Sequence, residues 1–188
     1  MAFTVETGSG ISGANSLVSL AEADAYWTDR NSTAWLALTD TQKQAALIAA
    51  SEYLSGFLAW IGIKSNPNQI LAWPRAVYFD SSGLIAVSID VVNSRLVDYT
   101  GVPVLVRQAT IRVAHAVGVA GVDLFGSVSP DAGVKRVKAG SVEVEFDERA
   151  VSIGLNGRPD FPWLMDMLRL FVDGGGQSAF VNRRVARV

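Results

Sequence analysis

The sequence predicts a mainly α-helical protein: a small bundle of about four helices with one β-hairpin and extended N- and C-terminal arms. Two capping-box sequences each precede apolar residues at helical spacing, and prolines open two further apolar runs. With 188 residues, 49% of them hydrophobic, the chain can bury a core as one domain. We therefore expect a helical domain over residues 1–172, with the hairpin at about 134–147, and a hinged tail over residues 173–188.

The first 18 residues are rich in glycine, serine and threonine, which predicts an extended or looped arm rather than a helix. This arm carries the apolar residues Phe3, Val5, Ile11 and Leu17. We expect these side chains to lie against the rest of the protein.

Two helices follow the arm. Ser19 and Glu22 have the spacing of a capping box and open a helix of about three turns, which ends at Asn31. Thr39 and Gln42 form a second capping box, and the helix that they open runs to about Leu58. Together with later segments, these helices are expected to bury six large aromatic residues in the core: Trp27, Trp35, Tyr53, Phe57, Trp73 and Trp163.

The stretch at residues 69–75, QILAWPR, predicts a helix stop with a buried ring. Pro74 cannot continue a helix, and Trp73 is a large ring that a compact domain buries. Arg75 places a planar fork of hydrogen-bond donors beside that ring. Residues 76–101 are harder to interpret, because the apolar piece at 84–92 is compatible with a strand or a buried loop.

A third helix is expected from Pro103 to about Ala120, apolar on most sides and therefore central. Gln108, Arg112 and His115 form a narrow polar stripe on it, which is either a subunit contact or a solvent-facing edge.

The hairpin pairs residues 134–138 with residues 141–146 across a turn at Ala139-Gly140. One arm is basic and the other is acidic, so the charged side chains either pair across the strands or contact a neighbouring subunit. The residues concerned are Lys135, Arg136, Lys138, Glu143 and Glu145. A last helix is predicted over residues 163–172, and glycines at 174–176 separate it from a basic tail.

The sequence gives no positive case for an enzyme, a cofactor or a metal site. It has no cysteine and one histidine, and it contains none of the common phosphate-loop, nucleophile-elbow or zinc-hydrolase motifs. The formal net charge of −2 does not favour a nucleic-acid ligand. No signal peptide or membrane span is visible, so we expect a soluble protein made inside the cell.

Several sequence elements, taken in order along the chain, resemble those of a protein family found in tailed bacteriophages and prophages. The run GANSLVSLAEADAYW at residues 13–27 is similar to that family's opening, and WLALT at 35–39 and LAWPR at 71–75 resemble its next two elements. The proline-started helix from Val102-Pro103, the hairpin at 134–146 and the run FPWL at 161–164 follow in the same order. Residues 84–101 and the tail after Gly174 depart from the family's pattern.

The resemblance implies a head–tail connector, or adaptor: a virion structural protein of the neck, between capsid and tail, that resides in the host cytoplasm during assembly. Members are expected to form a homo-oligomeric ring, a dodecamer, that binds the portal protein and meets the tail or further neck proteins. Genomic DNA would pass through the channel of the ring without sequence-specific binding. Some members are instead labelled DnaT-like single-stranded-DNA-binding proteins, which is the alternative.

The two functions need different residues. For the adaptor, we expect the tail to contact the portal or a neighbouring subunit through Phe180, Arg183, Arg184, Arg187 and Val188. Binding of single-stranded DNA needs cations near aromatic rings, and the candidates are the basic hairpin arm with Phe146 or the tail arginines with Phe180. The negative net charge favours the adaptor.

Overall fold

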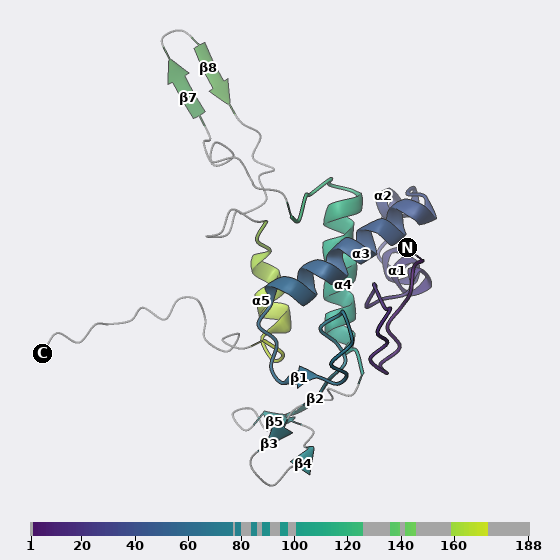
Figure 1. Cartoon of the computed structure of the whole chain (residues 1–188). Coiled ribbons are helices and arrows are strands. Elements are labelled where there is room, and N and C mark those ends of the chain that lie inside the picture. The colour runs from purple at the N-terminus through teal and green to yellow at the C-terminus, as the bar shows by residue number, and fades with distance from the viewer. Residues whose placement is uncertain are drawn as a thin grey trace, which may run out of the picture.

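The computed structural model describes residues 2–75, 101–125 and 159–172 with their side chains, and between them the backbone of several short strands (Figure 1). Its described part is mainly helical, as the sequence predicts. The helices are α1 (Leu20–Thr28), α2 (Thr33–Leu36), α3 (Asp40–Phe57), α4 (Val104–Gly118) and α5 (Pro162–Leu168). In Figure 1, α3 crosses α4 at the centre of the body, with α1 and α2 at one end of α3 and α5 at the other.

The described strands form antiparallel pairs, each a sheet of two strands. The pairs are β1 (Ile63–Lys64) with β2 (Arg75–Ala76), β3 (Tyr78–Phe79) with β4 (Leu84–Ile85), β5 (Ser88–Asp90) with β6 (Arg95–Val97), and β7 (Arg136–Ala139) with β8 (Val142–Glu145). The segment 84–92, which the sequence left open between strand and loop, thus contains β4 and β5. The predicted hairpin is β7–β8.

The two capping boxes form to different extents. Thr39 and Gln42 form the complete box, in which the Gln42 N–H donates to the Thr39 hydroxyl at 3.3 Å and the Thr39 N–H donates to the Gln42 amide oxygen at 2.9 Å. At α1, the Ser19 hydroxyl accepts from the Glu22 N–H at 3.2 Å. The Glu22 carboxylate pairs instead with Arg107 of α4, at 3.1 Å, so it ties the two helices together.

The helix α4 is central, as predicted, and its close packing depends on a small residue. Val106, Ala109, Ile111 and Val113 are buried along it. A Cβ added at Gly118 would lie 2.9 Å from a methyl group of Leu38, so this end of α4 approaches the segment before α3 closely.

The polar stripe of α4 is partly solvent-facing, because Arg112 is exposed and Gln108 and His115 are half-buried, but two of its side chains also have partners on other elements. The Arg112 guanidinium donates to the Tyr26 hydroxyl at 2.8 Å, and His115 shares a hydrogen bond with the Ser32 hydroxyl at 3.1 Å. The His115 ring lies 4.3 Å from the ring of Trp27. The stripe therefore packs against α1 and the start of α2, because those elements offer aromatic faces and hydroxyl groups that suit its cations and imidazole.

The N-terminal segment lies against the helices, as expected for its apolar residues. Val5 bridges Ser16 in parallel, and Asn15 joins the two stretches by accepting from the Thr4 N–H and donating to the Ala2 carbonyl, each at 2.8 Å. The Glu6 carboxylate is buried and accepts four backbone N–H groups of the turn that follows, from Gly8, Ser9, Gly10 and Ile11. The turn is thereby fixed by a carboxylate that supplies the acceptors its backbone lacks.

Trp73 is fully buried where three chain segments meet. Its ring packs edge-on against Trp60 at 5.4 Å and against Phe171 at 5.6 Å. The Trp73–Pro74 peptide bond is cis. The Arg75 guanidinium, also buried, donates to the backbone carbonyls of the segment before β1 and of the segment before Trp73.

The remaining aromatic residues of the expected core differ in burial. Trp35 and Tyr53 are buried, and Trp27 and Trp163 are partly buried against the core. Phe57 was expected in the core but is 36% exposed. It is the last residue of α3, one turn beyond Tyr53, where the helix runs past the packed interior.

No helix in the described part of the chain combines the length and the apolar character that crossing a membrane would need.

We expect Trp73→Ala to lower the free energy of unfolding by about 3–5 kcal/mol, since it truncates a fully buried ring. Urea denaturation measures this change. The matched control is Ile70→Ala in the same stretch, where the side chain is 58% exposed and the cost should stay within about 0.5 kcal/mol. A Trp73→Ala protein of unchanged stability would show that the ring is not a core residue.

Candidate functional site

The turn predicted at Ala139-Gly140 is wrong by one residue, because Ala139 belongs to β7 and stands opposite Val142 of β8. Arg136 stands opposite Glu145, and Lys138 stands opposite Glu143. Opposite charges at facing positions of an antiparallel pair stabilise it by a few tenths of a kcal/mol to about 1 kcal/mol. Lys135 and the predicted tail contacts lie outside the described residues; the latter are Phe180, Arg183, Arg184, Arg187 and Val188.

Phe125 and Pro159, the described residues on either side of the hairpin-bearing segment 126–158, both contact the C-terminal part of α3. On the entering side, the ring of Phe125 lies 5.8 Å from the ring of Phe57. On the returning side, the Tyr53 hydroxyl donates to the Pro159 carbonyl at 2.8 Å, and its ring packs edge-on against Phe161 at 5.8 Å. Since Tyr53 and Phe57 are one turn apart and touch edge-on at 5.2 Å, one face of one helix holds both ends.

The last described residues before the tail contact the chain just beyond the end of α3. Val172 pairs with Trp60 in an antiparallel bridge, and the Ile61 N–H donates to the Phe171 carbonyl at 2.9 Å. The predicted final helix therefore ends earlier than expected, at Leu168, because the chain turns at residues 169–171 to reach Trp60. We call Tyr53, Phe57 and Trp60 with the segment ends at Phe125, Pro159 and Val172 the root pole.

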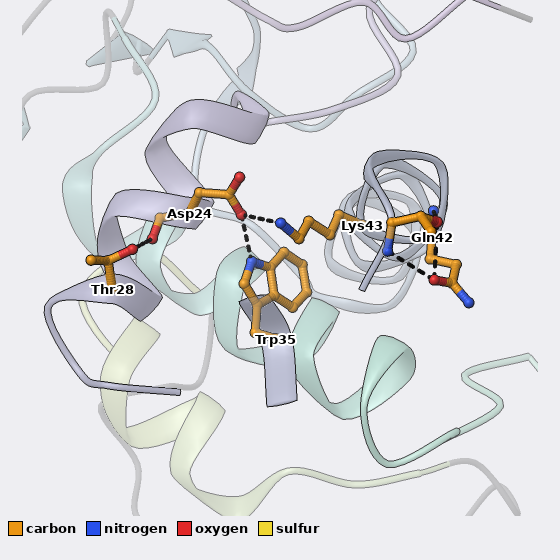
Figure 2. Close-up of polar contacts among 6 residues, drawn as sticks. Asp24, Thr28, Trp35, Gln42 and Lys43 are labelled. Carbon is orange, nitrogen blue, oxygen red and sulfur yellow. Dashed lines mark hydrogen bonds and ion pairs between the residues drawn. The ribbon is translucent and has the colours of Figure 1, made fainter. Parts of the chain in front are cut away.

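Basic side chains of the described body are largely engaged within it. Figure 2 shows the most buried case, in which the Lys43 ammonium lies 3.0 Å from the Asp24 carboxylate and the Trp35 indole N–H donates to the same oxygen at 2.9 Å. Arg30 lies over the Tyr26 ring at 3.6 Å, and Lys64 donates to the carbonyls of residues 69 and 70. With the contacts of Arg75, Arg107 and Arg112 given above, six basic residues of the body have internal partners.

The residues that carry the family resemblance therefore have structural roles. Asp24 anchors both Lys43 and Trp35, and Tyr26 accepts from Arg112. Trp73 and Arg75 join their own segment to the segment at residues 60–62. Across the described residues, no group of three or more histidine, aspartate or glutamate side chains is arranged to hold a metal ion.

Sequence reasoning missed three features of this arrangement. The Glu6 turn had a signal in the run Glu6-Thr7-Gly8-Ser9-Gly10, since a carboxylate before a glycine-rich turn can cap its N–H groups. The Asp24–Lys43 pair had none, because the two residues lie on different helices. Phe125 was passed over as part of a loop, although it is 50% exposed and lies at the root pole.

Comparison with known proteins places the chain in a family. Over residues 1–188 it matches the family described as "Putative DnaT-like ssDNA binding protein", and it belongs to that family. No curated protein and no solved structure gives a match.

His115 gives a pH dependence that can be measured without ambiguity, as it is the single histidine of the sequence. Burial lowers the pKa of His115 below its ordinary value of 6.5. Between the two pKa values the unfolded chain binds more protons than the folded one, so stability rises with pH there. We expect the free energy of unfolding to fall as the pH drops from about 6.5 toward the lower pKa of the folded state.

Denaturant unfolding at a series of pH values measures this effect, and the NMR titration of the imidazole gives the folded-state pKa directly. His115→Gln is the control, because it keeps a polar partner for Ser32 but does not titrate. If this variant loses stability on acidification to the same extent as the wild type, the pH dependence does not come from His115.

Proposed function

We propose that this protein is a head–tail adaptor of a tailed phage or prophage: a non-catalytic subunit of a ring that joins portal to tail and leaves a channel for DNA. One observation carries the proposal, which is the convergence of the hairpin segment and the tail on the root pole. In this proposal a single partner surface engages both segments, since Phe125, Pro159 and Val172 all contact residues between positions 53 and 60.

The hairpin supports an assembly role on energetic grounds. A sheet of two strands is marginally stable by itself in water, and β7 pairs with β8 alone among the described strands. Packing against a neighbouring subunit would supply the missing stabilisation. In this proposal its charged positions also orient that contact, since complementary charges fix register more than they add affinity.

The charge distribution of the body supports a structural role as well. A groove for nucleic acid needs cations that can face phosphates. Each of the six basic residues named above contacts a carboxylate, a hydroxyl, an aromatic face or backbone carbonyls of the same chain, and Lys43 and Arg75 are also buried. The body is therefore better suited to packing against other proteins than to binding DNA.

In this proposal, residues 177–188 contact the portal, with Arg183, Arg184 and Arg187 facing its carboxylates. Deleting residues 177–188 should abolish binding to the portal protein of the same phage and leave the thermal unfolding midpoint unchanged. The deletion begins beyond Val172, where the chain makes its last described contact with the body.

Co-purification with the portal measures the first effect and calorimetry the second. Alanine at the three arginines should reproduce the loss, whereas alanine at the neighbouring polar residues Gln177, Ser178 and Asn182 should not. Unchanged portal binding after the deletion would rule out this role for the tail.

A second candidate function is binding of single-stranded DNA. The family match favours it, because the description of that family names this activity and does not mention a neck or a portal. The residues available to it are Lys135, Arg136 and Lys138 with Phe146, or the tail arginines with Phe180.

An electrophoretic mobility shift with oligothymidylate tests this candidate. On the adaptor proposal, we expect no shift at protein concentrations up to about 1 μM and physiological salt, since non-specific binding is typically weaker than that. A salt-dependent shift at nanomolar protein would instead favour the DNA-binding function over the adaptor.

A further inference from the structure

The outer surface of α4 carries a guanidinium group that shares one tyrosine with a second guanidinium group from α1. Arg112 is exposed; its Nε donates to the Tyr26 hydroxyl at 2.8 Å, and its guanidinium lies 5.8 Å from the centre of the Trp163 ring. Arg30 is also exposed and lies over the face of the Tyr26 ring at 3.6 Å. We call Arg30, Arg112, Tyr26 and Trp163 the arginine patch.

The positive charge of the arginine patch has no carboxylate partner in the described part of the chain. Neither of the ion pairs given above includes Arg30 or Arg112. Their contacts are a backbone carbonyl, a hydroxyl group and two aromatic rings, all of them neutral. Arginine recognises carboxylates well, and arginine, tyrosine and tryptophan are enriched at the energetic centres of protein interfaces. The patch therefore suits a protein partner that supplies a carboxylate.

The arginine patch lies on the side of α4 that faces away from α3. The two helices pack together near Gly118, where an added Cβ would lie 3.4 Å from the Cβ of Ala46 in α3. The buried Ala114, one turn before Gly118, lies on the same face of α4. Arg112 is two residues before Ala114, so its side chain points to the opposite face.

Helix α3 presents a carboxylate on its own outer face. Ala50 is buried one turn after Ala46, and Glu52, two residues further on, is exposed on the other side of the helix. Residues three and four positions away are neighbours on a helix surface. For Glu52 these residues are uncharged, so its charge is not neutralised within α3, and most of them are small enough to let a second protein approach closely. They are Ile48, Ala49, Ser55 and Gly56.

We propose that the arginine patch of one copy of this chain receives Glu52 of a second copy, so that the outer face of α4 packs against the outer face of α3 in the next subunit. This inference rests on the ring of the proposed adaptor and names its subunit contact. A contact between two different faces of the same protein is heterologous, and its repetition forms a ring when the rotation between neighbours closes. Single-stranded DNA suits the patch less well, because bases stack on free ring faces, whereas Tyr26 is 8% exposed and lies under Arg30.

Sedimentation velocity of the full-length protein over a range of concentrations measures the self-association. We expect Arg30→Glu and Glu52→Arg each to weaken it about 10-fold or more, because each variant places like charges opposite one another. The two substitutions combined in one chain should recover part of the loss. Lys64→Glu is the matched control, since it changes the charge of an exposed side chain in β1 by the same amount and should leave the association unchanged.

A cross-linking experiment reports the contact directly, because the sequence contains no cysteine. A short bismaleimide should join Glu52→Cys protein to Arg112→Cys protein when the two are mixed. Glu52→Cys protein alone should not form the cross-linked dimer, since the proposed contact never brings two copies of position 52 together.

Charge variants that associate as strongly as the wild type would overturn this contact and leave the ring to another interface. A wild-type protein that stays monomeric at all concentrations would also overturn it, and portal binding by that monomer would show that the adaptor function survives. If Arg30→Glu weakened portal binding but not self-association, the patch would serve the portal and the inference would be wrong. Weaker binding of oligothymidylate by the same variant, with unchanged sedimentation, would identify a phosphate site and likewise contradict the inference.

Discussion

The hydrogen bonds of the Arg75 guanidinium hold together the part of the chain on which the rest of the structure depends. They reach the carbonyls of Trp60, Ile61 and Gly62 on one segment and of Ala72 on another. A buried charge is costly unless it is well hydrogen-bonded, and the planar fork of arginine can serve several acceptors in different directions. Because Trp73 lies beside it, between Trp60 and Phe171, the same place fixes the end of α3, the β1–β2 pair and the last described residues.

These contacts of Arg75 and Trp73 link the folding of the protein to both candidate functions through α3. Tyr53 and Phe57 hold the two ends of the hairpin segment, and Trp60, three residues after Phe57, holds the root of the tail. The Trp60 indole N–H also donates to the Leu54 carbonyl at 2.8 Å, which satisfies a carbonyl near the helix end. A substitution that weakens the contacts of Arg75 or Trp73 would therefore disturb the contact of Val172 with Trp60. Through the end of α3, it would also disturb the contacts of Phe125 and Pro159.

Features that depend on neighbouring residues could be predicted from the sequence. The Thr39–Gln42 box, the burial of Trp73 and the existence of the β7–β8 hairpin follow from local spacing and alternation, although the register of the hairpin differs from the predicted turn at Ala139-Gly140. Features that depend on how helices meet could not. Phe57 has the spacing of a core residue, but its burial is decided by where α3 passes the interior. Likewise, the hydrogen bonds of Arg112 with Tyr26 and of His115 with Ser32 depend on where α4 meets α1 and α2.

The two candidate functions differ less in electrostatics than their names suggest. Portal carboxylates and DNA phosphates are both anionic, so the basic residues outside the described body would give salt-sensitive binding to either one. The net charge of −2 and the internal partners of six body cations both favour the adaptor, but neither concerns the basic residues of the hairpin and the tail. Binding of single-stranded DNA also needs aromatic rings on which bases stack, whereas a portal contact does not, so salt dependence alone does not decide between the two functions and the loss of stacking rings does.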